Sequence, residues 1–293
     1  MLVDVHTHLP THDAPVQESD IIYNTTMRPN HRIRMTNSVD NYIQDMDPVD
    51  RCFIFGIAPR PPEINGSPEQ ITPLPERNIN DTAAMVAQRH PDKVIGFMSV
   101  HPDAPDAMDE LERCVHDLGL RGMKLGPNYQ NFDPVGENAR RVYAYAQQNG
   151  LPIVFHQGTS PVRDAPLRYA HPLAMDEIAM MYPDLKIVMA HLGHPWHADT
   201  IAVVRKHPNV FTDCSAQFYR PWSQYNGFRL AYEWDITDKI LFASDWPVTT
   251  PAETIAGLKD FNGFAREHHL PEVPQEVFDG ILNRDALALL GLE

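Results

Sequence analysis

Short apolar runs rich in β-branched residues recur along the whole chain, and segments with helical character separate them. Runs of the first kind predict strands, and the longer segments between them predict helices. The predicted strands are Leu2–His6, Arg51–Ile57, Val94–Val100, Gly122–Leu125, Ile153–His156, Lys186–His191, Asn209–Asp213 and Lys239–Asp245. The predicted helices are Ile79–Arg89, Ala104–Leu118, Glu137–Asn149, Leu173–Met181, Thr200–Lys206, Ser223–Trp234 and Ala252–Phe261.

This alternation favours an α/β fold with an all-parallel sheet, and eight is the number of strands that closes into a (β/α)8 TIM barrel. A doubly wound open sheet is the rival fold, but eight strands without a glycine-rich phosphate loop would be unusual for it. A length of 293 residues suits one barrel, since such barrels typically take about 250 residues. We therefore expect a single domain over 1–293, closed by a final amphipathic helix within Asn283–Leu290.

Two segments exceed what a minimal barrel needs. Residues 9–49 form a long insertion after the first strand, and residues 58–76 are rich in proline and glycine. Loops of this length in a compact domain are usually functional lids or contact surfaces. Insertions that follow strands lie on the catalytic face of a barrel, so we expect both there.

The charge and composition narrow the class of function. The formal net charge of −15 at pH 7 disfavours binding to nucleic acid or to an anionic membrane, although local arginines could still bind an acidic substrate. No apolar stretch reaches the length of a membrane span, and the N-terminus lacks a targeting pattern. Three cysteines without CxxC spacing argue against a disulfide framework. These features indicate a soluble, cytoplasmic protein.

Residue types that bind metals stand at the ends of several predicted strands. His6 and His8 close the first, His156 and His191 end two later ones, and Asp245 ends the last. The period of a strand points His6 and His8 to one side, although such a pair alone could also begin a surface loop. Parallel strands bring their carboxyl ends to one face, so these side chains converge there. Imidazoles with one carboxylate are the ligands of a catalytic divalent cation.

At this point the chain resembles a known group, the amidohydrolase superfamily, in the branch that includes aminocarboxymuconate-semialdehyde decarboxylase and related hydrolases, hydratases and decarboxylases. The resemblance extends over essentially the whole chain, and its motifs identify the superfamily without identifying a substrate. They are His6-Thr7-His8, Gly119-Leu120-Arg121-Gly122-Met123-Lys124-Leu125, His156, His191-Leu192-Gly193, Ser244-Asp245-Trp246-Pro247 and the helix at Asn283–Leu290.

The resemblance implies that His6, His8, His156 and Asp245 bind one divalent metal. Zn²⁺ suits these ligands best and Mn²⁺ is the alternative. It also implies catalytic roles for Asp245, as the group that accepts and passes on a proton, and for His191, as a residue beside the metal that stabilises charge. For Lys124 three roles stay open: a contact to the substrate, a carboxylated bridge between two metals, and an ion-paired barrel residue.

Several residues are candidates to bind the substrate. Arg28 and Arg32 lie in the insertion together with His31 and Arg34, where an arginine could bind a carboxylate in bidentate fashion. The same segment could instead be solvated or form a contact in a homodimer. Aromatic and basic residues that follow other strands could line the pocket: Tyr129, Arg163, Trp196, Tyr219, Arg220 and Trp222. We expect a small-molecule acid as the partner of this site, and cyclic or aromatic-derived compounds are the candidates.

Two reactions use the same ligand set. The leading hypothesis is hydrolysis of a C–O or C–N bond, such as that of a lactone, by a metal-activated water. The alternative is non-oxidative decarboxylation of an aromatic or muconate-like acid, and hydration is a third possibility.

Overall fold

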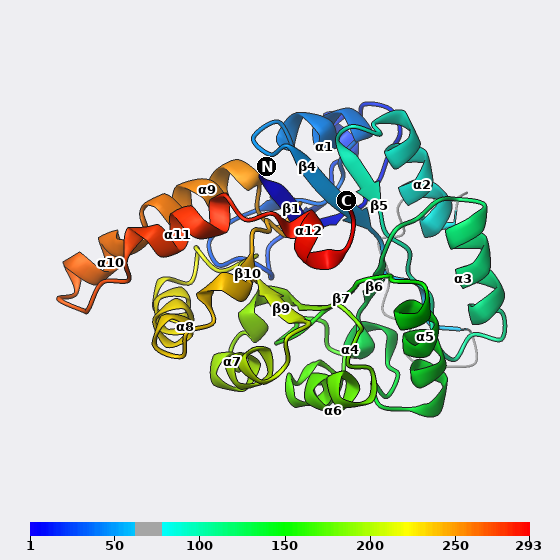
Figure 1. The fold of residues 1–293 in the computed structure, drawn as a ribbon. Coiled ribbons are helices and arrows are strands. Elements are labelled where there is room, and N and C mark those ends of the chain that lie inside the picture. Colours follow the sequence, from blue (N-terminus) through cyan, green and yellow to red (C-terminus); the bar gives the residue numbers. More distant parts are fainter. Residues whose placement is uncertain (62–77) are drawn as a thin grey trace.

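Parallel strands form a closed barrel at the centre of the computed structural model, which describes residues 1–61 and 78–293 (Figure 1). The eight strands are β1 (Val3–His8), β4 (Arg51–Phe55), β5 (Val94–Gly96), β6 (Met123–Leu125), β7 (Ile153–Phe155), β8 (Ile187–Met189), β9 (Val210–Asp213) and β10 (Ile240–Leu241). They pair as β1-β4-β5 and as β6 through β10. Parallel bridges from Met98 to Met123 and from Thr7 to Trp246 join the two sheets into a ring. The predicted TIM-barrel fold is confirmed.

Helices surround this ring in Figure 1. Those that alternate with the strands are α2 (Ile79–Arg89), α3 (Ala107–His116), α5 (Glu137–Gln148), α6 (Leu173–Met181), α7 (His197–Lys206), α8 (Pro221–Glu233) and α9 (Pro251–Lys259). Each corresponds to a helix expected from the sequence, and α2 and α6 have the predicted bounds. Short 3-10 helices also lie between the main elements: η1 (Glu18–Asp20), η2 (Leu167–Ala170), η3 (Ala190–Gly193) and η4 (Thr237–Lys239).

The structure also contains elements that the sequence pattern did not predict. The insertion over 9–49 holds a small antiparallel pair, β2 (Tyr23–Asn24) and β3 (Ile33–Arg34), and the helix α1 (Val39–Asp45). Further helices are α4 (Pro127–Gln130), α10 (Phe261–Glu267) and α11 (Gln275–Leu282). The start of α1 carried a local signal, because Ser38 and Asn41 form a reciprocal capping box. Of the predicted loop over 58–76, residues 62–76 lie outside the described residues.

Two apolar clusters lie on the two sides of the barrel wall. The larger packs the outward side chains of the strands against the helices, and the smaller fills the interior with residues such as Val5, Phe53 and Val188. The helix α12 (Ala286–Leu290) joins the interior cluster through Ala286, Leu287 and Leu290. It lies across the end of the barrel that faces the reader in Figure 1. The predicted closing helix is therefore present, and the opposite end of the barrel remains for the site.

The insertion over 9–49 is fastened where it leaves and rejoins the barrel. The backbone N–H groups of Thr11 and His12 both donate to the carbonyl of Asn37, and Asn37 N–H donates to Thr11 Oγ1. The segment therefore leaves and returns at one place and extends over the carboxyl ends of the strands, on the face where insertions were expected. In the described part of the chain, no helix has both the length and the apolar character needed to cross a bilayer.

The packing of α12 predicts the effect of a substitution in its last turn. Leu290 is fully buried in the interior cluster, so Leu290→Ala should lower the free energy of unfolding by about 2–5 kcal/mol because it leaves a cavity. Leu173→Ala, the same change at a site that is 51% exposed, should shift it by less than about 0.5 kcal/mol. Urea unfolding followed by circular dichroism measures both. Equal stability of the two variants would contradict the role of α12 as a closing element.

Candidate active site

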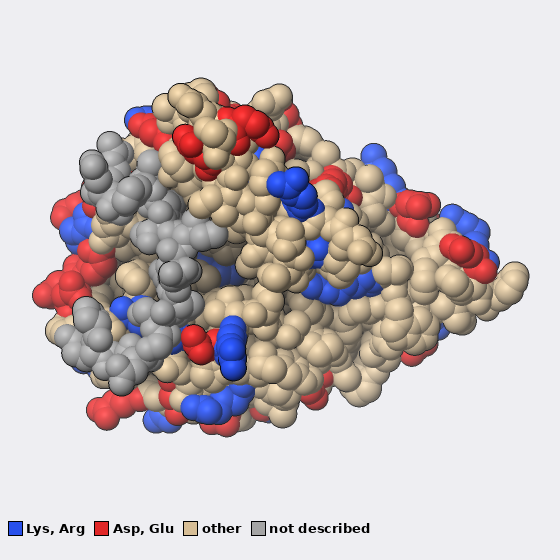
Figure 2. All heavy atoms as spheres, turned by 180° about the vertical axis from the view of Figure 1, so that it is seen from behind, with Lys and Arg blue, Asp and Glu red and all other residues tan. Residues whose placement is uncertain are grey.

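A cavity of about 400 Å³ opens at the carboxyl ends of the strands. The face turned toward the reader in Figure 2, opposite that of Figure 1, is hollowed near its centre. The described lining of the cavity includes the polar residues His8, Lys124, His156, His191, His194 and Asp245. Met27 and Met35 from the insertion also line it. Four of the predicted strand-end residues, His8, His156, His191 and Asp245, therefore meet in one cavity that the insertion helps to enclose, and His6 is buried beside it. The volume of the cavity lies in the lower part of the range typical of small-molecule sites, about 300–1,000 Å³.

A β-bulge directs the two histidines of β1 into this cavity. Strict alternation would place His6 and His8 on the face opposite Val3 and Val5, which belong to the interior cluster. The register between β1 and β4 shifts between Asp4 and Thr7. A bulge of this kind reorients the following side chains, so His6 and His8 also point inward, side by side with ring centroids 5.3 Å apart.

His6, His8 and Asp245 form one of two close groups of potential metal ligands among the described residues. Asp245 Oδ1 lies 3.2 Å from His8 Nε2 and 3.4 Å from His6 Nε2. Ligands about 2.1 Å from a tetrahedral ion are separated by roughly 3.4 Å, so these spacings fit a divalent cation. The backbone N–H of Asp245 also donates to the carbonyl of His6, which fixes the last strand against the first. One ligand atom from each residue lies within 4.8 Å of the others.

His156 faces the same cavity but stands outside that tight group. Its ring centroid lies 5.1 Å from that of His191 and 4.5 Å from that of Tyr129. Its Nε2 atom is buried and has no hydrogen-bond partner among the described residues. An unpartnered imidazole nitrogen beside three other candidate ligands fits a fourth ligand to a metal, and the role predicted for His156 stays a prediction.

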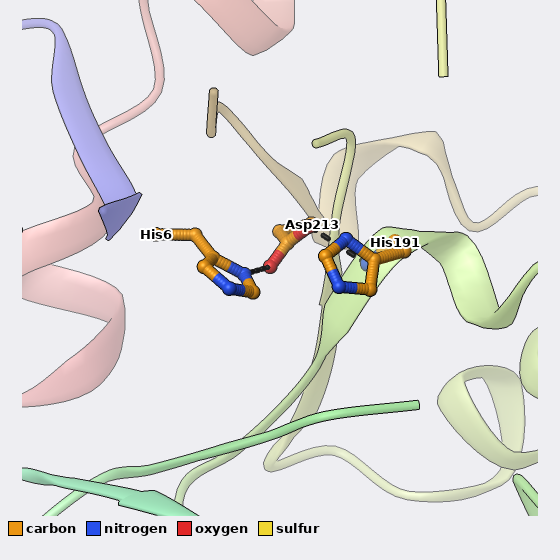
Figure 3. A group of neighbouring side chains, drawn as sticks. All are labelled: His6, His191 and Asp213. Atoms are coloured by element: carbon orange, nitrogen blue, oxygen red, sulfur yellow. Dashed lines mark hydrogen bonds and ion pairs between the residues drawn. The ribbon is translucent and has the colours of Figure 1, made fainter. Parts of the chain in front are cut away.

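Asp213, at the end of β9, connects His6 and His191 (Figure 3). Its Oδ2 accepts a hydrogen bond from His6 Nδ1 at 2.9 Å. Its Oδ1 accepts from the backbone N–H groups of His191 and Ser215, at 2.8 and 3.0 Å, and from the Ser215 hydroxyl at 2.5 Å. Because the Ser215 proton is engaged there, its oxygen accepts from His191 Nδ1 at 2.7 Å. Both imidazoles therefore carry their proton on Nδ1 and present an Nε2 lone pair.

Burial controls the protonation of these groups. It lowers the pKa values of His6, His156 and His191 well below the usual range, so all three are neutral near pH 7. Neutral imidazole is the form that binds metals. Burial likewise raises the pKa of Asp245, while His8 and Lys124 oppose that rise. It lowers the pKa of Lys124 to about 8.

Lys124 stands directly beside the histidine–carboxylate group. It is fully buried, and its Nζ lies 3.0 Å from His6 Nε2 and 4.9 Å from the centroid of the Phe55 ring. Among the described residues, Lys124 forms no ion pair within 4 Å. Its ammonium group is therefore available to an acidic ligand on the cavity floor.

The remaining predicted substrate contacts lie in different places. Tyr129 lines the cavity, as do Tyr219 and Arg220. Arg28 and Arg32 line a separate depression instead. Arg28 pairs with Glu253 at 3.0 Å, and Arg32 stacks on the Tyr23 ring. Trp196 begins α7 and packs against His171, with ring centroids 4.8 Å apart, and is not part of the described cavity lining.

The sequence interpretation missed Asp213, and the signal for it was present. His156 was selected because it ends a predicted apolar strand, and Asp213 likewise ends the predicted strand Asn209–Asp213. The rule that selected His156 therefore also selects Asp213. His194, which lies beyond the strand that ends at His191, is also buried and lines the cavity. Burial lowers its pKa to about 3.

Comparison with known proteins identifies the family. The profile of the amidohydrolase family matches residues 3–292, so the chain belongs to that family. By sequence the chain is similar to γ-resorcylate decarboxylase from Rhizobium radiobacter, at 24% identity over 217 residues. That match covers 58% of this chain and 65% of the relative, slightly less than two thirds of its length.

Solved structures share the fold. A dihydroxybenzoic acid decarboxylase from a Polaromonas species, with bound manganese and the inhibitor 2-nitroresorcinol, superposes with a TM-score of 0.63 at 17% identity, covering 100% of this chain and 98% of that one. A probable 2-pyrone-4,6-dicarboxylic acid hydrolase from Acinetobacter baumannii, with citric acid bound, superposes with a TM-score of 0.59 at 15% identity, covering 99% of both chains. Decarboxylases and a hydrolase therefore share this barrel.

The Asp213 contacts predict how its replacement acts. Asp213→Asn offers an amide where His6 Nδ1–H now meets a carboxylate, so the imidazole loses the partner that orients its Nε2. We expect the affinity for Zn²⁺ or Mn²⁺ to fall about 10- to 100-fold, as for other hydrogen-bonding partners of metal ligands. Metal titration of chelator-treated protein measures this, with Asp184→Asn at an exposed position as the control. Unchanged affinity would exclude the orienting role.

Proposed function

We propose that the protein is a metal-dependent carboxy-lyase that removes CO₂ from a small aromatic or muconate-like acid. The observation that carries this proposal is the position of the buried Lys124 ammonium beside the His6–His8–Asp245 group on the floor of a small cavity. A cation beside a metal-ligand group is suited to bind a carboxylate. The similarity to decarboxylases supports this reaction better than hydrolysis, which the sequence had put first.

One divalent metal is part of the proposal. His6, His8, His156 and Asp245 would hold it, and the matching ligand separations and the unpartnered His156 Nε2 support this set. When bound, the ion would polarise the acid and an adjacent oxygen of the substrate. The imidazole ligands suit Zn²⁺, whereas a structural relative contains manganese, so both ions are candidates.

Different side chains of the site would bind the substrate, exclude water and transfer the proton. Lys124 would bind and orient the carboxylate, and apolar residues such as Phe55, Met27 and Met35 would keep bulk water from the ring. As the C–C bond breaks, the electron pair stays with the ring carbon, CO₂ leaves, and that carbon takes one proton. Asp245 is suited to carry this proton because burial raises its pKa.

The two reactions give different products, so product analysis tests the proposal. Metal-loaded enzyme should release CO₂ from at least one acid in a panel of hydroxybenzoates and muconate-like acids. In D₂O the product should carry one deuterium at the carbon that lost CO₂. A parallel panel of lactones should yield no ring-opened acid. Hydrolysis of a lactone without CO₂ release from any acid would reject the carboxy-lyase and favour the hydrolase.

The role of His191 can be separated from that of the metal ligands. Its Nε2 is presented to the cavity by Ser215, and it also belongs to a second possible ligand group with His6 and Asp213. We expect His191→Ala to lower the rate by roughly 10²–10³-fold because it removes charge stabilisation, with metal content little changed. His6→Ala should lose metal and activity together. Metal content from elemental analysis, measured together with turnover, distinguishes the two roles. Metal loss in His191→Ala would make His191 a ligand.

A further inference from the structure

The cavity holds a second fixed cation besides Lys124. Arg220 stands at the start of α8, after β9, and lines the cavity. Two hydrogen bonds hold its guanidinium group, from Nη1 to the carbonyl of Ala216 at 2.8 Å and from Nη2 to the carbonyl of Met27 at 3.3 Å. It also stacks on the Tyr219 ring, 4.4 Å from the centroid. The carbonyls orient the guanidinium but do not neutralise it.

Arg28 provides a contrast close by. It packs over the same Tyr219 ring, 5.2 Å from the centroid, but its charge is matched by Glu253 at 3.0 Å. Among the described residues, Arg220 has no carboxylate partner within 4 Å, and Asp245 is the one acidic residue in the cavity lining. The part of the lining that the structure describes thus carries two cations, Lys124 and Arg220, against one carboxylate in a chain whose net charge is −15. Such an excess of positive charge indicates an anionic ligand with more than one acidic group.

The two cations lie at different depths. Lys124 lies on the barrel floor beside His6, whereas Arg220 is tied to the insertion through Met27. The electrostatic influence of Arg220 reaches His194, whose ring centroid lies 5.5 Å from that of His191. Arg220 therefore lies to one side of the place where the reacting carboxylate would bind. Lys and Arg side chains also gather beside the hollow in Figure 2.

We propose that the substrate is a diacid, and that Arg220 binds the acidic group that does not react. This rests on the proposed function for the identity of the reacting group. A guanidinium held by two carbonyls keeps further N–H donors for a carboxylate, and its fixed geometry selects where the second acid must lie on the ring. Arg220 is thus a specificity-determining residue, and the ligand is a single-ring or muconate-like compound with two carboxylates.

Binding of unreactive acids tests this without turnover. Isothermal titration of the metal-loaded wild type should show at least one of the three benzenedicarboxylates binding roughly 10- to 100-fold more tightly than benzoate, as expected for an added charge-assisted contact. Arg220→Gln should remove that advantage while leaving benzoate affinity within about 3-fold. Arg28→Gln, which alters a neutralised arginine outside the cavity lining, should keep it.

Kinetics gives an independent readout. For any diacid that releases CO₂, Arg220→Gln should raise KM more than it lowers kcat, because the contact is to a group that does not react. The proposal is overturned if no benzenedicarboxylate binds wild type more tightly than benzoate, if the advantage survives in Arg220→Gln, or if that variant impairs mono- and diacids equally. If the variant fails to fold, the affinities of the wild type for the benzenedicarboxylates and for benzoate still test the proposal. Selective diacid binding without CO₂ release would reject the carboxy-lyase and retain the diacid site.

Discussion

The carboxylate of Asp213 is the contact on which the geometry of the site depends. A fully buried carboxylate is costly unless hydrogen bonds compensate for its lost hydration. Here four donors do so, and they come from the first strand, from the turn after β8 and from the loop after β9. The same contact that stabilises the acid therefore sets the tautomers of His6 and His191. The hydrogen bonds that stabilise the buried Asp213 carboxylate are thus the same ones that prepare the imidazole nitrogens for chemistry.

The backbone conformation around His191 shows why the hydrogen bonds to Asp213 are needed. His191 and Leu192 adopt positive φ angles of 62° and 47°, a conformation that is unfavourable for residues other than glycine. The hydrogen bond from His191 N–H to Asp213 holds this turn and places the imidazole over the cavity. Asp245, which follows β10, two strands away in the ring, also has a positive φ of 67°. Two candidate site residues thus lie on strained backbone that the surrounding contacts support.

Most of the barrel was predictable from the sequence because strand and helix periodicity reflects burial directly. The apolar runs located all eight strands, and their carboxyl ends located His8, His156, His191 and Asp245 in one cavity. The inward direction of His6 was expected without its physical cause, because strict alternation from Val5 contradicts it and only the bulge in β1 permits it. The structure of the insertion was the least predictable part of the described chain. The path of a loop depends on contacts such as that between Thr11 and Asn37, which periodicity does not encode. Arg28 was a reasonable candidate by residue type, but its pairing with Glu253 is a long-range contact.

The closure of the ring between β1 and β10 has a consequence for the order of events during synthesis. His6 is made more than two hundred residues before Asp245, which lies beside it in the fold and follows seven further barrel strands. Contacts so distant in sequence form slowly, because a long loop must close before they stabilise anything. A nascent chain that lacks β10 therefore also lacks Asp245, and the edges of β1 and β9 have no partner strand. The candidate site is completed only when the barrel closes, and an incomplete chain exposes the edge of β1 to other molecules.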